Sequence, residues 1–229
     1  MTNHAIGTEK ESSLHAALKS WYSERGDLLE SRIEGFIVDI LRGDLVIEIQ
    51  TGDFGRLKKK LSVLLKYYHV RVVYPLAITK WVSRCKSVDC DSLKRRKSPR
   101  HKRVENLFDE LIYITGLLRN PNYSVEVVLI EQEDLWLDDG KGSWRRGNWS
   151  ILDRKLLSVH DRFLFQTPRD YLNLLPSKLD EKFTSRDVAT QLNISRQLAY
   201  RMLYCLEKMQ LIFVCGHQGR YRLLSVVKE

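Results

Sequence analysis

Residues 38–51, VDILRGDLVIEIQT, contain the pattern from which we predict the fold of this chain. Two β-type runs, at 35–41 and 45–50, are joined by Arg42-Gly43-Asp44, a combination that is typical of a tight hairpin turn. Polar and apolar side chains alternate around the turn, as they do in strands with two different faces. The stretch therefore predicts an antiparallel hairpin.

Two registers of this hairpin are open, and both place Asp39, Glu48 and Gln50 on one face. A turn at 43–44 sets Asp39 directly opposite Glu48, whereas a turn one residue earlier sets it opposite Val46. Carboxylates are costly to bury without a partner, and divalent cations prefer oxygen ligands. The pattern therefore favours a divalent cation, and the alternative is that both acids simply lie on an exposed sheet face.

Other periodic runs surround the hairpin. Helices are predicted from Ser12 or Ser13 to about Ser23, at 54–67 and at 104–118, and further strands at 70–77 and 124–131. Helices and strands that alternate in this way predict an α/β fold with a mixed sheet. Gln166-Thr167-Pro168 marks a boundary, so we expect one domain at 1–165 and a second, smaller domain at 166–229.

The composition is that of a globular protein, because 43% hydrophobic and 29% charged residues are enough to build a core and exclude a mainly disordered chain. We expect no membrane span, because no long apolar run is present. The N-terminus lacks the apolar core of a secretory signal and the four cysteines are scattered, so a reducing cytoplasm is expected. The net charge of +9 indicates a polyanionic partner.

Much of the positive charge lies in residues 94–103, KRRKSPRHKR, where seven of ten residues are Lys or Arg and none is acidic. Such clusters gain affinity for phosphates by releasing condensed counterions, so we expect a loop that holds a nucleic acid backbone. A solvated loop or a sorting signal is the alternative. Trp144, Arg145, Arg146 and Trp149 form a second cluster that suits stacking on bases or holding phosphates, unless the tryptophans are core anchors.

The C-terminal stretch has a different pattern. A short helix at 186–191, a tight turn, a longer helix at 196–209 and strand runs at 211–215 and 220–224 follow one another. In this order they resemble a winged helix-turn-helix over about fifty residues. The resemblance implies that Arg196, Gln197, Tyr200 and Arg201 form the exposed start of a recognition helix. A protein–protein module of the same shape is the alternative.

The carboxylate pattern resembles the core of the PD-(D/E)XK nuclease superfamily, in which a helix Glu, a strand Asp and a strand E-x-K surround one or two Mg²⁺ ions. Asp39 corresponds to the strand Asp, Glu48 to the second acid, and Glu11 to the helix acid. The lysine position is Gln50, a variant that some active restriction enzymes of this superfamily carry. The resemblance implies a restriction-endonuclease-like mixed-sheet core, with Asp39, Glu48 and Glu11 as metal ligands, Gln50 orienting water, and Lys58 or Lys60 supplying the missing charge.

These resemblances imply a metal-dependent endonuclease that hydrolyses phosphodiester bonds in DNA with Mg²⁺ or Mn²⁺, in restriction, repair or junction resolution. Structured RNA is the alternative substrate, and a homodimer is expected because many enzymes of this fold cut both strands as dimers. The competing hypotheses are a non-catalytic DNA-binding transcriptional regulator, whose α/β domain senses a ligand or dimerises, and a nuclease-fold subunit of a larger complex. The residues expected to contact nucleic acid are Lys58, Lys60, Lys94, Arg95, Arg96, Lys97, Arg100, Lys102, Arg103, Arg145, Arg146, Arg196, Gln197, Tyr200, Arg201 and Arg220.

Overall fold

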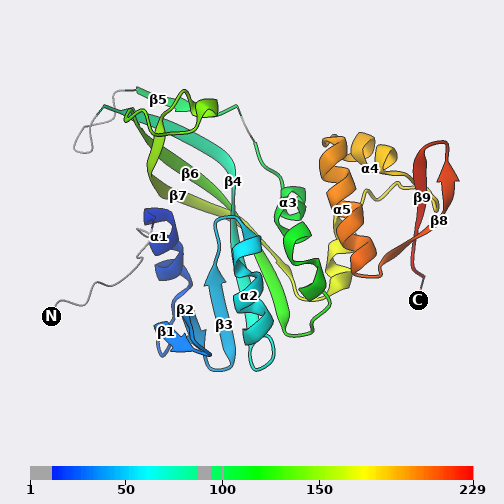
Figure 1. Cartoon of the computed structure of the whole chain (residues 1–229), viewed down its shortest axis with the longest axis horizontal. Coiled ribbons are helices and arrows are strands. Elements are labelled where there is room, and N and C mark those ends of the chain that lie inside the picture. Colours follow the sequence, from blue (N-terminus) through cyan, green and yellow to red (C-terminus); the bar gives the residue numbers. More distant parts are fainter. Residues whose placement is uncertain (1–11, 87–93, 100, 229) are drawn as a thin grey trace. The chain divides into compact units, whose positions relative to one another are not determined.

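The computed structural model describes residues 12–86, 94–99 and 101–228 (Figure 1). The chain divides into two compact units, and each unit is assembled from separate segments. The first unit comprises Met1–Asp27, Pro75–Lys102 and Val128–Arg162, and the second comprises Leu28–Tyr74, Arg103–Val127 and Phe163–Glu229. Both predicted carboxylates on the hairpin therefore belong to the second unit.

A mixed sheet contains seven strands of the described chain. They are β1 (Leu28–Ile33), β2 (Phe36–Arg42), β3 (Leu45–Ile49), β4 (His69–Cys85), β5 (Lys94–Lys97), β6 (Tyr123–Leu137) and β7 (Ser150–Phe165). Their order is β1-β2-β3-β4-β6-β7, and β5 pairs with β4. The neighbours β1, β2 and β3 are antiparallel, whereas β3 and β4 are parallel, as a helical connection between them requires. The predicted α/β fold with a mixed sheet is confirmed.

The helices include four predicted from periodicity. The α-helices are α1 (Ser13–Tyr22), α2 (Phe54–Leu64), α3 (Phe108–Leu111), α4 (Ser185–Leu192) and α5 (Arg196–Lys208), and the 3-10 helices are η1 (Val104–Leu107), η2 (Ile112–Leu117), η3 (Trp144–Arg146) and η4 (Pro168–Leu174). Ser12 caps α1 by accepting the N–H of His15. The apolar stripe of α2 is buried as predicted, and Phe54 packs edge-to-face on Tyr74 of β4.

The hairpin of β2 and β3 takes one of the two predicted registers. Ile40 pairs with Ile47 and Arg42 with Leu45, which places the turn at 43–44. Gly43 adopts a left-handed conformation with φ of +59°, which favours glycine because a side chain there would be strained. This is the register in which Asp39 lies opposite Glu48.

Several predictions about the elements were incomplete or wrong. The run at 94–97 is the edge strand β5 rather than a loop, and it pairs with residues 81–84 of β4. Strands β1 and β7 were missed, and β4 and β6 are about twice as long as predicted. The helix expected at 104–118 is broken into η1, α3 and η2, with a non-helical backbone at Ile114. Polar residues on these long, half-exposed strands interrupt the apolar runs that predict strands.

The C-terminal module, residues 183–226, contains α4, α5, β8 (Ile212–Gln218) and β9 (Tyr221–Val226). Thr184 caps α4 and shares hydrogen bonds with Asp187. Asn193 ends α4 in the left-handed conformation, and Ser195 caps α5 at once, which makes the sharp turn between the helices. β8 and β9 form an antiparallel hairpin, and Phe183 forms an isolated bridge to β9. The predicted order of elements is confirmed.

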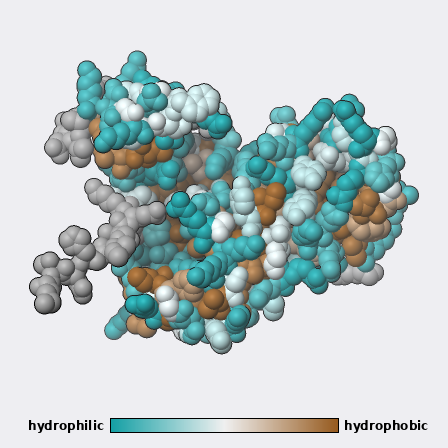
Figure 2. Space-filling model, viewed as in Figure 1, coloured by the Kyte–Doolittle hydropathy of each residue, from teal (hydrophilic) through white to brown (hydrophobic). Residues whose placement is uncertain are grey.

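The hairpin of β1 and β2 has an apolar outer surface. Leu28, Leu29 and Ile37 are each at least half exposed, and hydrophobic residues gather over this hairpin at the lower left of Figure 2. β1 is an edge strand of the sheet, so its outer backbone groups have no strand neighbour in the described chain. Among the described residues, no helix has the length and apolar character needed to cross a membrane.

Candidate functional site

Two carboxylates meet where β2 and β3 separate. Asp39 on β2 directs its Oδ2 toward β3, where it accepts the N–H of Ile49 at 2.7 Å. Glu48, the preceding residue on β3, lies directly opposite Asp39 in the observed register. The two acids are close enough for the charge of Asp39 to raise the pKa of Glu48. The sequence-predicted pair is therefore brought together by the hairpin itself.

Glu48 is a buried carboxylate with only part of its charge compensated. Its side chain is 4% exposed, and its Oε2 lies 2.6 Å from the Nζ of Lys60 on α2. Lys60 also donates to the carbonyl oxygen of Ile37 at 2.5 Å. The other oxygen, Oε1, is buried and has no hydrogen-bond partner among the described residues. Burial raises the pKa of Glu48 to about 7, while the charge of Lys60 opposes this and the charge of Asp39 adds to it.

Gln50 follows β3, and hydrogen bonds from its amide nitrogen fix its side chain. Nε2 donates to the carbonyl oxygens of Gly52 and Asp53, the second at 3.3 Å. Both donors of the amide therefore serve the loop that leads into α2, and the carbonyl oxygen Oε1 remains as the acceptor of this side chain. A carbonyl oxygen is a suitable ligand for a hard cation or a hydrogen-bond acceptor for water.

Glu110 of α3 is a further acid near this loop that the sequence analysis missed. Its Oε2 accepts the N–H of Phe54, the first residue of α2, at 3.1 Å. Asp53 at the N-cap position makes no side-chain cap, so Glu110 supplies it from a distant segment. No sequence signal called for this partner, because Asp53 is itself a residue type that commonly caps helices. Burial and the charges of Glu110 and Asp109 together raise the pKa of Tyr74.

The donor set matches the preferences of Mg²⁺ or Mn²⁺ in part. An unpartnered, buried Glu48 oxygen beside a second carboxylate is what an oxygen-ligated cation would complete. Within the described ranges, no group of three or more His, Cys, Asp or Glu side chains is disposed to hold a metal. The predicted third acid, Glu11, lies outside the described residues. The described chain therefore supplies two carboxylates and an amide oxygen.

The buried carboxylate predicts a pH-dependent stability. Between the ordinary pKa of 4.5 and about 7, folded chain retains a proton on Glu48 that unfolded chain has released, so the free energy of unfolding falls as pH rises. Glu48→Gln removes this dependence. Relative to the unmodified chain, its free energy of unfolding should therefore rise by up to about 3 kcal/mol between pH 5 and pH 8. Urea denaturation of both proteins in EDTA measures the difference. Parallel pH profiles would show that Glu48 is already ionised at pH 5.

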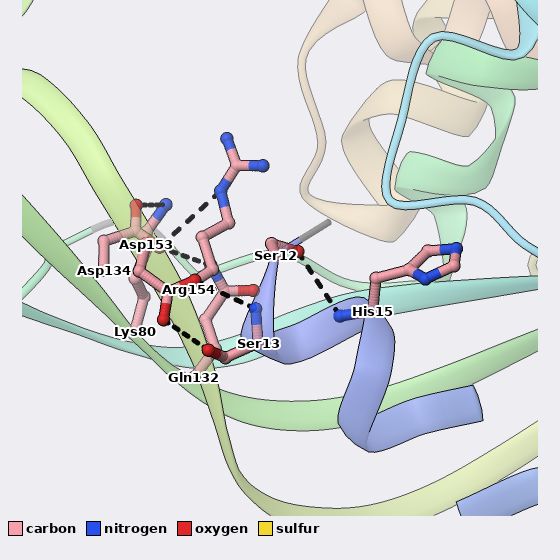
Figure 3. Close-up of polar contacts among 8 residues, drawn as sticks. All are labelled: Ser12, Ser13, His15, Lys80, Gln132, Asp134, Asp153 and Arg154. Atoms are coloured by element: carbon pink, nitrogen blue, oxygen red, sulfur yellow. Dashed lines mark hydrogen bonds and ion pairs between the residues drawn. The ribbon is translucent and has the colours of Figure 1, made fainter. Parts of the chain in front are cut away.

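A second buried acid, Asp134, lies in the first unit and is fully surrounded (Figure 3). Lys80 and Gln132 lie 2.6 and 2.7 Å from its oxygens, and Arg154 lies at 3.9 Å. Lys80 and Arg154 balance the negative charge of Asp134.

The same view shows how α1 is anchored at its start (Figure 3). Asp153 of β7 accepts the N–H and, at 2.5 Å, the hydroxyl of Ser13, and these bonds lower the pKa of Asp153 despite its partial burial. His15 donates its backbone N–H to Ser12 at 3.3 Å, and its ring points away from the other labelled residues.

The basic edge strand β5 and all five tryptophans belong to the first unit. Lys94, Arg95, Arg96 and Lys97 of β5 are all exposed, and Arg95 also pairs with Glu133 at 3.2 Å. Each of the five tryptophans has a guanidinium within 6 Å of its ring centroid. The pairs are Arg84 with Trp149, Arg95 with Trp81, Arg96 with Trp136, Arg145 with Trp144 and Arg162 with Trp21. One face of each ring is therefore occupied by a cation rather than open to a base.

Two of the basic residues predicted to contact nucleic acid, Arg103 and Arg201, instead bond to other residues of the second unit. Arg103 donates to the carbonyl oxygen of Leu192 at 2.6 Å and to Glu105 at 2.9 Å, so it holds the C-terminal end of α4. Arg201 is half-buried and pairs with Asp109 of α3. The expectation that Arg201 lies on the exposed side of its helix was therefore wrong.

The other predicted contacts differ in their exposure. Lys58, Lys102, Arg145, Arg196, Gln197, Tyr200 and Arg220 are exposed, and Arg146 is half-buried and donates to the carbonyl oxygen of Trp149 at 3.1 Å. Arg100 lies outside the described residues. Lys60 faces Glu48 rather than solvent. It is one of the two lysines expected to supply positive charge to the site.

Comparison with known proteins places most of this architecture in one family. The family described as "Domain of unknown function (DUF8091)" matches residues 12–166, which run from α1 to the end of β7 and include both carboxylates and β5. A relative from Treponema pallidum (strain Nichols), titled "Uncharacterized protein", is 36% identical over 185 residues, which cover 80% of this chain and 73% of that relative. No solved structure matches the chain. The chain is a member of the DUF8091 family.

Proposed function

We propose that this protein is a metal-dependent phosphodiesterase that cuts DNA. The observation that carries the proposal is the buried Oε1 of Glu48, which has no described partner although Asp39 lies beside it and Lys60 holds the other oxygen. An unpaired buried oxygen costs about 1–3 kcal/mol, and a bound cation would remove that cost. Glu105 also has an unpaired buried oxygen, and what sets Glu48 apart is the second carboxylate, Asp39, beside it. Each oxygen of Asp134 has a nitrogen nearby, with Lys80 Nζ 2.6 Å from Oδ2 as an ion pair and Gln132 Nε2 donating to Oδ1 at 2.7 Å, whereas Oε1 of Glu48 has neither kind of contact among the described residues.

The residues of the site have distinct roles in this proposal. A bound Mg²⁺ or Mn²⁺ would lower the pKa of a ligated water and stabilise negative charge on the phosphate. Asp39 and Glu48 would hold that cation, and Glu11 is the candidate for a third acid. Gln50, fixed by its amide nitrogen, would accept a hydrogen bond from the attacking water, because an amide is not a base at neutral pH.

Lys60 is the candidate for the charge that E-x-Q lacks. Its ammonium is carried by the helix after the E-x-Q strand and lies within hydrogen-bond distance of Glu48. From this position it would balance the two acids and place positive charge beside the phosphate. The order α1, β2, β3, α2, β4 also agrees with the restriction-endonuclease-like core that the sequence pattern resembles.

Nucleic acid is the proposed substrate because two separate surfaces fit it. Exposed Lys and Arg side chains follow β5, and arginines stacked on tryptophans present ordered guanidinium groups to phosphates. The C-terminal module has the element order of a winged helix-turn-helix, with Arg196, Gln197 and Tyr200 exposed at the start of α5.

A non-catalytic DNA-binding regulator is the second candidate, and the burial of Glu48 favours it. Such a protein would bury this face of the hairpin, and Glu48 is 4% exposed beneath Lys60. In that case the ion pair of Glu48 and Lys60 would fix α2 on the sheet. The nuclease is expected to cut DNA and the regulator is not, so a cleavage assay distinguishes the two candidates.

The test is incubation of the purified chain with supercoiled plasmid, linear duplex, branched duplex and single strands in Mg²⁺, Mn²⁺ or EDTA. The proposal expects cutting that depends on the metal and binding that survives in EDTA. Binding without cutting on every substrate, in both metals, would favour the regulator.

A substitution of Lys60 tests its role directly. Lys60→Met is expected to move the acid limb of the pH–rate profile to higher pH by about one unit or more, because the charge of Lys60 lowers the pKa of Glu48. Lys59→Met, an exposed change on the same helix, is the matched control and should leave the profile in place. An unshifted profile in the Lys60 variant would remove this lysine from the site.

A further inference from the structure

A groove lies between α5 and the β8–β9 hairpin of the C-terminal module. It encloses about 500 Å³, and its lining includes Arg196, Gln197, Tyr200, Tyr204, Arg220 and Tyr221. Apolar ring surface and guanidinium groups therefore line the same concave space. This combination suits a ligand that has a flat aromatic part and a negative charge.

The groove is electrically positive. Arg196, Arg220 and Arg222 contribute to its lining, and its one acid, Glu207, is paired with Arg222. The hydrogen bond and charge of Arg220 lower the pKa of Tyr221, and the charges of Arg196 and Arg186 add to this effect. Arg196 and Arg220 carry exposed charges that no described acid neutralises within the groove. An anion is the complementary ligand.

Tyr200 offers the open ring. It is 55% exposed, and its ring is nearly parallel to that of Tyr204, with centroids 6.5 Å apart. Lys208 lies over Tyr204 at 5.4 Å and Arg220 lies over Tyr221 at 5.4 Å, whereas no described cation lies over Tyr200. A base that enters the groove would therefore stack on Tyr200 first.

We propose that this groove binds an unpaired nucleotide, with its base on Tyr200, its base edge at Gln197 and its phosphate between Arg196 and Arg220. Bases inside a duplex present only their edges, because neighbouring bases cover their faces, so a tyrosine ring gains stacking energy from an unpaired or extruded base. The inference rests on the proposed function only in that the module binds nucleic acid. It specifies the substrate as DNA with a single-stranded segment, such as an overhang, flap or junction.

Fluorescence anisotropy with the full chain in EDTA tests the groove without any cleavage. The probes are a labelled single strand, a blunt duplex of the same sequence, and that duplex with a single-stranded overhang. Tyr200→Ala should weaken binding of the single strand and the overhang by about tenfold, and of the blunt duplex by less than twofold, because one stacked base contributes about 1–3 kcal/mol. Tyr200→Trp should restore binding of the single strand. Tyr67→Ala, at a tyrosine 65% exposed outside the groove, is the matched control.

Three outcomes would overturn the inference. Equal losses on the blunt duplex and the single strand would show that Tyr200 serves duplex binding, and an unchanged affinity in Tyr200→Ala would show that no base stacks there. Absence of binding to all three probes would remove nucleic acid as the ligand. Cleavage is measured separately in Mg²⁺ or Mn²⁺, so a chain that shows the expected binding but never cuts would retain the groove and lose the nuclease proposal.

Discussion

Glu48→Gln is expected to lower the rate of metal-dependent DNA cleavage about 100-fold or more, while binding to DNA in EDTA stays within twofold. Glutamine has the shape of glutamate but carries no negative charge, so it would hold a divalent cation far more weakly. The substitution keeps an oxygen acceptor for Lys60 and removes a charge that is costly to bury, so the fold is retained. Plasmid nicking and single-turnover kinetics on a labelled duplex measure the loss.

Asp39→Asn should lower the cleavage rate by a similar factor, because it also removes a negative charge from the site. The remaining side-chain oxygen can still accept the N–H of Ile49, so the end of the hairpin is preserved. Glu34→Gln is the matched control, because it removes an exposed carboxylate from the turn between β1 and β2. Activity within twofold of the unmodified chain in both site variants would show that the carboxylates do not take part in cleavage.

Removing three charges from β5 is expected to produce the largest change in DNA affinity. Lys94, Arg96 and Lys97 are exposed, and replacing all three with Gln should reduce affinity by roughly one to two orders of magnitude at low salt. The slope of log affinity against log salt should become shallower by about 3 for duplex DNA, because each phosphate contact contributes about 0.9. Arg95 is left in place, since it also pairs with Glu133 within the fold.

The control for this prediction removes the same number of charges elsewhere. Arg25, Lys66 and Lys178 are exposed and lie outside β5, so their triple replacement with Gln tests the effect of net charge alone. Equal losses in both triple variants would mean that overall charge, and not the basic strand, holds the DNA. A salt slope that does not change in the β5 variant would exclude phosphate contacts by this strand.

The sequence by itself determined the elements whose signals are local. Ser12 and the apolar spacing that follows it specify α1, and the Arg42-Gly43-Asp44 turn specifies the hairpin of β2 and β3. Thr184 and Ser195 mark the starts of α4 and α5 in the same way. Caps, turns and periodicities act over a few residues, so they can be read without knowledge of the rest of the fold. The hairpin pattern alone placed Asp39 and Glu48 on one face, and the observed register chose between the two possible pairings.

The tertiary structure decided everything that depends on distant segments. A polar run such as 94–97 becomes a strand only because β4 offers it a partner, and its sequence contains no apolar alternation that would show this. Lys60 rather than Lys58 reaches Glu48 because α2 returns across the sheet at one particular rotation. Its approach leaves one oxygen of Glu48 unpaired next to Asp39, and this combination distinguishes the candidate site from the other buried acids.

Arg201 and Glu110 illustrate the same division. Both are polar residues whose spacing allows an exposed position, and both instead bind groups far away in the chain, Asp109 and the start of α2. A helical pattern shows which residues share a face, but it does not show which neighbour that face will meet. The sequence therefore determined the local elements and the shared face of the two acids. Long-range packing decided the burial of the acids, their partners and the groove beside α5.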